Sequence, residues 1–193
     1  MPSFFCSTAG ASLGSAVGTG VTFTGGAGAD SVILSNAFTK AITMGAGNDT
    51  VTYGGAAGVG GSVAAGDGSD TIIMTNVQAA AASLTSTFNS TFTGFEALRL
   101  SDVLLGTVDL DGINGATKVV LAAGATGGTI NNMASGGTVT YLAAGAGGAT
   151  VNVKSALVGT SDVLNLVLDR TAGTLAAGSV TVANVEAIAI NAA

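Results

Sequence analysis

The sequence predicts an all-β protein built as a solenoid, in which short strands and tight turns repeat along the chain. A glycine-and-aspartate motif occurs three times near the start of the chain at a nearly constant spacing, as expected of a repeat architecture. Short β-prone runs alternate with glycine clusters, and the 193 residues include 31 glycines but one proline. Hydrophobic residues make up 48% of the chain and aromatic residues only 5%, so the core must be thin and aliphatic.

Residues 1–20 are mostly small, apolar and uncharged, and we expect a leader or an edge segment there. Residues 1–6 carry no positively charged start and make a poor secretory signal. Residues 21–76 predict the first part of the solenoid, because apolar and polar residues alternate between turns rich in Gly, Asn and Asp. The expected strands are 21–24, 31–34, 41–44, 50–53 and 71–75.

Residues 77–93 interrupt this rhythm. The alanines of residues 77–84 predict a short helix or an excursion from the solenoid, and the Ser/Thr-rich residues 85–93 predict an extended or looped segment. The solenoid is then expected to continue, so that residues 77–193 and 21–76 form one structural domain overall. Further short strands are expected at 117–124, 128–132, 137–145 and 149–153.

The later part of the chain contains two offset modules. The separation of Asp70 from Glu96 (96 − 70) is nearly equal to that of Asp162 from Glu186 (186 − 162). Each acid stands immediately before a β-prone run. The symmetry favours a repeated structural role for the two glutamates over a pair of catalytic carboxylates. A stacked asparagine ladder is a further expectation at Asn131 and Asn132.

The repeated motif has the composition of a turn that binds a hard cation. Its aspartates recur at nearly equal intervals (49 − 30 and 70 − 49), which places them on one edge of successive coils. Glycine lets backbone carbonyls turn toward an ion, Asp supplies charge, and stacked aspartates without an ion repel one another. The alternative is that each Asp only caps a tight turn. The candidate metal-binding residues are Gly26, Gly28, Asp30, Gly45, Gly47, Asp49, Gly66, Asp67, Gly68 and Asp70.

The loops at 25–33, 44–52 and 65–73 resemble the Gly-Gly-x-Gly-x-Asp-x-aliphatic-x nonapeptide of repeats-in-toxin (RTX) proteins. The resemblance implies a right-handed parallel β-helix that begins as a β-roll over residues 21–76, with Ca²⁺ held between stacked loops. Met44 and Ala65 replace the first glycine in two copies, and the opposite edge carries no aspartate. The resemblance therefore implies one row of two calcium sites.

Residues 94–100 and 184–190 resemble strands of bacterial surface-layer (S-layer) proteins and large RTX-type adhesins. This resemblance implies a secreted protein at the bacterial cell surface, exported by type I secretion as an unfolded chain.

The remaining acidic residues are ambiguous. Asp102, Asp109 and Asp111 form a second acidic cluster, for which solvated turn carboxylates are favoured over another calcium site. The same interpretation is favoured for Asp162 and Asp169.

Composition argues against several classes of function. Five basic residues against eleven acidic ones, net charge −6, provide no basic stripe for nucleic acid. The chain has no histidine to act as a general base or to pair with Cys6 as a nucleophile, so we expect no enzyme. The glycine loops lack the Lys-Ser/Thr of a nucleotide cradle, and no apolar run is long enough to predict a membrane-spanning helix.

The expected function is that of a structural extracellular surface protein whose solenoid is ordered by Ca²⁺ and self-associates into filaments or sheets. One alternative is an adhesin or ligand-binding module, although the two tyrosines and seven phenylalanines show no cluster in the sequence. Another is the non-catalytic calcium-binding region of a larger type I-secreted protein. Irregular Thr-x-Thr runs give weak support to an ice-binding solenoid.

Overall fold

The computed structural model describes residues 3–5, 8–55, 57, 60–169 and 175–192. The described chain is almost entirely β, and every strand pair that the registers define is parallel, so the predicted all-β parallel solenoid is confirmed. The short helices are α1 (Asn76–Ser83), α2 (Ser86–Thr91) and the 3₁₀ helix η1 (Leu110–Gly112). Cys6 lies outside the described residues.

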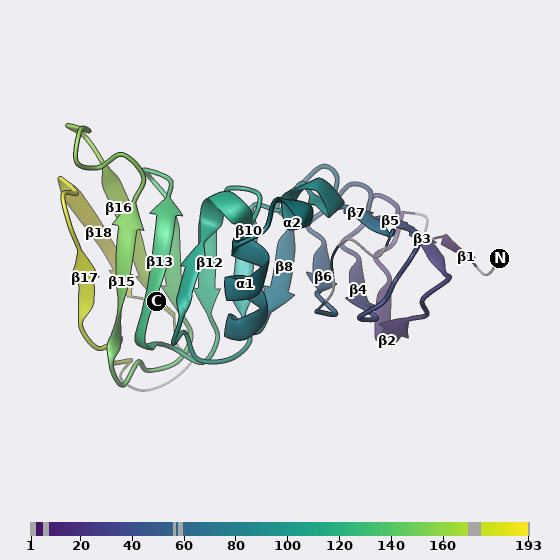
Figure 1. Ribbon diagram of the computed structural model, residues 1–193, viewed down its shortest axis with the longest axis horizontal. Helices are drawn as coiled ribbons and strands as arrows, with labels where there is room; N and C mark the ends of the chain where they lie inside the picture. Colours follow the sequence, from purple (N-terminus) through teal and green to yellow (C-terminus); the bar gives the residue numbers. More distant parts are fainter. Residues whose placement is uncertain (1–2, 6–7, 56, 58–59, 170–174, 193) are drawn as a thin grey trace. The chain divides into compact units, whose positions relative to one another are not determined.

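The chain divides into two compact units. Unit 1 comprises Met1–Ile73 with Thr85–Ala97, and unit 2 comprises Met74–Leu84 with Leu98–Ala193. Within each unit, odd- and even-numbered strands belong to different parallel sheets, as the strand labels in Figure 1 indicate. This alternation arises because each coil contributes one strand to each sheet.

Unit 1 is built from short strands whose inward residues stack in rows. In one sheet, Phe23 pairs with Ile42, Ile42 with Val63 and Val63 with Phe92, and all four side chains are buried. Alternation of side chains along each strand places threonine, serine and alanine on the other face. That sheet contains β1 (Ser3–Phe5), β3 (Thr22–Thr24), β5 (Ala41–Thr43), β7 (Ser62–Ala64) and β9 (Phe92–Thr93). The other contains β2 (Ser12–Val17), β4 (Ser31–Leu34), β6 (Thr50–Thr52) and β8 (Thr71–Met74).

Unit 2 repeats the scheme with longer strands. Val108, Ile130, Val151 and Val182 are successive register partners across one sheet, and the first three are fully buried or nearly so. That sheet contains β11 (Thr107–Asp109), β13 (Thr126–Met133), β15 (Gly148–Val153) and β17 (Val180–Val182). The other contains β10 (Ala97–Leu100), β12 (Lys118–Leu121), β14 (Thr138–Tyr141), β16 (Val163–Leu168) and β18 (Ala187–Ala192).

Four aromatic side chains cluster inside unit 1, which the sequence did not reveal. The rings of Phe88 and Phe92 stack with centroids 4.7 Å apart, and Tyr53 packs edge-on against both. Phe38 meets Phe92 edge-on with centroids 5.8 Å apart. Phe88 belongs to α2, so this packing explains why a Ser/Thr-rich segment expected to be extended or looped is helical.

The helix expected at 77–84 is present as α1. Its N-cap, Thr75, forms a capping box with Gln78, in which each side chain bonds to the other residue's backbone N–H. Asn76, the first helical residue, is buried, and its Oδ1 accepts hydrogen bonds from the N–H groups of Leu105 and Gly106. The polar start of α1 therefore fixes the chain that leads into β11.

Candidate cation-binding site

The three glycine loops of unit 1 stack directly on one another. The N–H of Ala46 bonds to the carbonyl of Gly26, and the N–H of Asp67 bonds to the carbonyl of Gly45. Gly66 has a φ of +105°, and a Cβ there would lie 1.8 Å from the Gly45 carbonyl oxygen. Glycine is therefore required both by the backbone conformation and by the close approach of the next loop.

The aspartate that ends each loop bonds to the coil before it. Asp49 Oδ1 accepts the N–H of Asp30 at 2.7 Å, and Asp70 Oδ1 accepts the N–H of Asp49 at 2.7 Å. Glu96 Oε2 continues the series by accepting the N–H of Asp70 at 2.8 Å. At the other end, Asp30 Oδ1 accepts the N–H of Ala11. We call this series of acids, Asp30, Asp49, Asp70 and Glu96, the carboxylate ladder.

The three aspartates of the carboxylate ladder are buried, but their oxygens are not all hydrogen-bonded. Asp30, Asp49 and Asp70 are each no more than 2% exposed. Asp30 Oδ2 accepts the N–H of Gly26 in its own loop, whereas Oδ2 of Asp49 and Oδ2 of Asp70 are buried without a hydrogen-bond partner. An unpartnered buried carboxylate oxygen is costly, and it calls for a proton or a cation.

The pKa values of the two inner carboxyls reflect this environment. Burial raises the pKa of Asp49 above 3.8, while the hydrogen bond from the Asp30 backbone acts in the opposite direction. Burial likewise raises the pKa of Asp70, and the nearby carboxylates of Glu96 and Asp67 raise it further. Both groups therefore bind a proton more readily in the folded chain than in the unfolded chain.

The predicted metal-binding residues are thus brought together, but not as a cage of carboxylates. Across the described residues, no three Asp, Glu, Cys or His side chains lie close enough to hold a metal. A cation in this unit would be held by one or two carboxylates, with backbone carbonyls of the glycine loops supplying the other oxygens, a donor set that Ca²⁺ accepts. Asp67 is exposed, and its backbone is already bonded to Gly45 and Gly47.

Most acidic residues of unit 2 have structural partners. Asp102 Oδ1 accepts the N–H of Asn76, and Asp109 Oδ1 accepts the Asn132 side chain. Asp111 forms an exposed ion pair with Lys154 at 2.8 Å. These contacts fit the interpretation of this cluster as surface turn carboxylates.

The expected asparagine ladder has one side-chain rung in unit 2. Asn152 donates from its side-chain amide to Asn131 Oδ1 at 2.8 Å. Asn132 has a φ of +58° and bonds to Asp109 instead of stacking on the next coil. The expectation therefore holds for Asn131 and not for its neighbour.

The two glutamates play matching roles, as the module symmetry predicted. Glu96 Oε2 accepts the N–H of Asp70, and Glu186 Oε2 accepts the N–H of Asp162 at 2.7 Å. The interpretation of Asp162 as a solvated carboxylate is wrong, because this residue is only 9% exposed and its Oδ2 is buried without a partner. The sequence feature that could have predicted this burial is the separation of Asp162 from Glu186, which is close to that of the buried Asp70 from Glu96.

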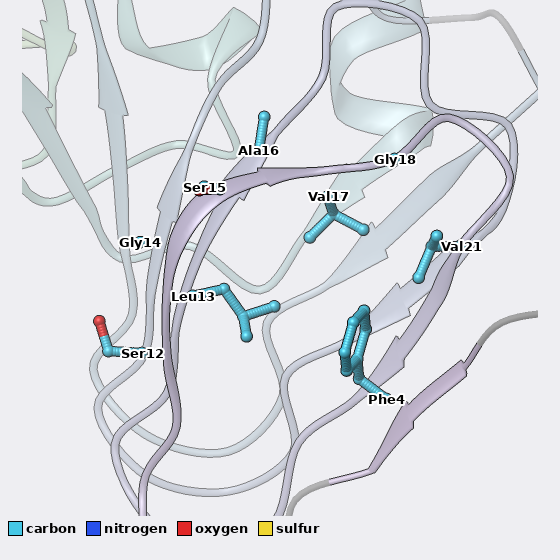
Figure 2. Close-up of a pocket in the computed structure, with 9 residues that line it drawn as sticks. All are labelled: Phe4, Ser12, Leu13, Gly14, Ser15, Ala16, Val17, Gly18 and Val21. Carbon is cyan, nitrogen blue, oxygen red and sulfur yellow. The ribbon is translucent and has the colours of Figure 1, made fainter.

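A pocket of about 400 Å³ lies in unit 1, between β2 and the segments that carry Phe4 and Val21. Figure 2 shows the side chains of Phe4, Leu13, Val17 and Val21 around the same space. Its lining carries no titratable side chain. The pocket therefore offers mostly apolar surface, with Ser12 and Ser15 as the polar side chains of its described lining.

No protein-family model matches the chain, and no curated protein matches it either. In the part of the chain that the structure describes, no helix is long and apolar enough to cross a membrane.

Proposed function

We propose that this chain is a structural part of an extracellular bacterial surface protein of the S-layer type, with a β-solenoid that is ordered by Ca²⁺ and self-associates. The observation that carries the proposal is the carboxylate ladder, in which buried oxygens of Asp49 and Asp70 have no partner. The resemblance of the three loops to RTX nonapeptides supports Ca²⁺ as the missing partner.

Calcium ordering follows from the linkage between binding and folding. The two inner carboxyls are costly to bury as anions, so a cation that binds only the folded chain stabilises it increasingly as its concentration rises. In the calcium-poor cytosol, the cost of burying these two carboxylates as anions delays folding. Outside the cell, calcium removes it, and this sequence of events suits export of an unfolded chain.

Self-association is supported by the exposed sheet edge in unit 2. All six residues of β18 are exposed, and Ile188 and Ile190 are 47% and 67% exposed. These isoleucines continue the inward rows of β16, since they pair in register with Leu164 and Leu166. A solenoid edge of this kind buries its apolar row by pairing with another strand.

Calcium dependence is tested by thermal unfolding of the whole protein in Ca²⁺, in Mg²⁺ and in EGTA. At a Ca²⁺ concentration about 100 times the Kd, the stabilisation is about 2.7 kcal/mol, which corresponds to a Tm increase of about 5–10 °C. The double variant Asp49→Asn/Asp70→Asn should lose most of the increase. The matched control Asp111→Asn, an exposed carboxylate of unit 2, should keep it.

Electron microscopy with and without Ca²⁺ tests assembly. Filaments or sheets that form only with Ca²⁺ support the proposal. A protein whose Tm, circular dichroism and assembly do not respond to either Ca²⁺ or EGTA would rule it out.

A further inference from the structure

The first strands of unit 1 and the last strands of unit 2 each have a neighbour on one side only. Among the described residues, β2 pairs with β4 alone and β18 pairs with β16 alone. In the other sheets, β1 pairs with β3 alone and β17 with β15 alone. An open strand edge presents main-chain N–H and C=O groups with which another strand can pair.

The open edges of β18 and β2 are complementary in direction. β18 follows β16 along the chain, β2 precedes β4, and both pairs are parallel. A strand added to β18 therefore takes the place of the next coil, and a strand added to β2 takes the place of the preceding coil. Two copies of the same edge can keep their inward faces aligned only if the two strands are antiparallel, an arrangement that none of the described strand registers adopts.

The apolar rows of the two edges match as well. Ile190 pairs with Leu166 and is 67% exposed, so the inward row of unit 2 ends on an uncovered side chain. The inward row of unit 1 begins at Val17, which pairs with Leu34. Ile190 placed opposite Val17 therefore adds one more aliphatic pair of the kind that joins the coils within each unit.

The apolar pocket of unit 1 leaves room for a second side chain of β18. Its described lining comes from residues 4–21, the first coil of the chain, and Leu13 and Val17 lie along it as Figure 2 shows. An internal coil is covered by a neighbour on both sides, whereas the first coil is covered on one. In a parallel pairing that places Ile190 opposite Val17, Ile188 comes to the Leu13 end of the pocket.

Charge keeps other surfaces of two copies apart but not these two. The net charge of −6 makes copies repel one another, yet residues 3–29 and 187–193 contain no charged side chain. Exposed strand edges are usually protected by Lys, Pro or an inward-pointing charge, and the sequences of β2 and β18 contain none of these. The two edges can therefore approach without burying a charge.

We propose that β18 of one copy pairs in parallel with β2 of the next, with Ile190 opposite Val17 and Ile188 over the pocket beside Leu13. The contact joins two different surfaces, so it is heterologous and copies add in series. This inference rests on the self-association proposed above and identifies the two surfaces that meet.

Sedimentation velocity on two variants, with Ca²⁺ present throughout, tests the pairing. Leu13→Lys places a charge on the inward face of β2 and Ile190→Lys places one on that of β18, and each variant keeps its other edge unaltered. Each variant alone should remain monomeric, and an equimolar mixture should form dimers. Dimerisation should be at least about 10-fold tighter in the mixture than in either variant alone, because only the mixture offers two uncharged edges.

Disulfide cross-linking gives a second measurement that does not depend on a lysine variant. In a Cys6→Ser background, Ala16→Cys and Ala189→Cys each place one thiol on an exposed residue next to the expected pair. Under oxidising conditions, their mixture should form disulfide dimers at least about 10-fold faster than either variant alone, since paired strands bring the two Cα atoms within disulfide range. Val158→Cys, in an exposed turn of unit 2, is the matched control and should not cross-link to Ala16→Cys.

The outcomes separate this inference from the proposal on which it rests. Dimers of Leu13→Lys alone, or rapid cross-linking of Ala189→Cys alone, would show that β18 meets a second β18. Dimers of Ile190→Lys alone would show that β2 meets a second β2. Either result, or an unaltered protein that associates while the mixed thiols do not cross-link, overturns the inference and leaves self-association standing. An unaltered protein that stays monomeric overturns both.

Discussion

At the scale of single residues, the aspartates of the glycine loops accept hydrogen bonds from backbone N–H groups. Asp49 and Asp70 each use one oxygen for a hydrogen bond to the preceding coil and keep the other buried without a partner. The same side chain thus stabilises the stacking and carries an electrostatic penalty. A substitution that removes the charge but keeps an acceptor oxygen, compared with one that removes both, distinguishes these two roles.

Asp70→Ala and Asp70→Asn should differ in their effect on the metal-free protein. Alanine leaves the buried N–H of Asp49 without an acceptor, which should cost about 1–3 kcal/mol of unfolding free energy. Asparagine keeps the acceptor and removes the charge, so its cost should be below about 1 kcal/mol. Urea unfolding in EGTA measures both values. Equal losses in the two variants would show that the charge, not the hydrogen bond, stabilises this coil.

The raised pKa values of Asp49 and Asp70 predict a pH dependence of the metal-free protein. A carboxyl whose pKa is higher in the folded state stabilises the fold fully below its unfolded pKa, near 3.8, and this contribution is lost as pH rises through the folded value. The Tm in EGTA should therefore rise as pH falls from 7 toward 4. The rise should shrink in Asp49→Asn/Asp70→Asn. A Tm that falls over this range equally in both proteins would contradict the prediction.

At the scale of elements, tight contact between loops fixes the spacing of the coils in unit 1. Gly66 and Gly45 have the same positive φ of +105°, and each faces a carbonyl of the preceding loop. The turns are therefore as constrained as the strands that they connect.

Gly66→Ala should destabilise unit 1 more than Gly60→Ala. Both glycines have positive φ, +105° and +98°, so both variants carry backbone strain of about 1–3 kcal/mol. Of the two, Gly66 is the one whose new Cβ meets another backbone, because no atom of the described residues lies within 4 Å of a Cβ at Gly60. Thermal unfolding of the two variants should show a larger Tm loss for Gly66→Ala, and equal losses would indicate that the loops are not in contact.

The sequence predicts the strands well where alternation is clear. Residues 31–34 and 50–53 correspond to β4 and β6 because one face of each is apolar. The strands β7 and β11 were not expected, since Ala64 and Asp109 are of residue types that are depleted in strands. The helix α2 was missed because the burial of Phe88 against distant aromatic rings, not local propensity, decides its conformation.

The candidate site, like the fold, could be predicted from the sequence only in part. Glycine and aspartate at a fixed spacing predicted which side chains share an edge, because the spacing is a local property of the repeat. Burial of Asp162 depends on the turn around Gly159 and on Glu186 from the next coil, which composition alone does not reveal.

At the scale of the whole molecule, the exposed apolar row of β18 predicts association. Ile190→Lys should leave the fold intact, because this side chain is already 67% exposed, and should weaken self-association. Val158→Lys changes an even more exposed apolar residue (81%) that lies in a turn and not on a sheet edge, so it should associate like the unaltered protein. Sedimentation velocity measures both. Identical sedimentation of the two variants would place the association surface elsewhere.

The carboxylate ladder also allows successive coils to contain different numbers of residues. The sequence separations between its successive acids are 19, 21 and 26, yet the distances from backbone N–H to carboxylate are 2.7, 2.7 and 2.8 Å. A coil can therefore gain or lose residues between two acids without shifting its neighbours. Insertions in the intervening turns are the natural way for such a chain to diversify its surface, while the stacked acids preserve the alignment of the coils.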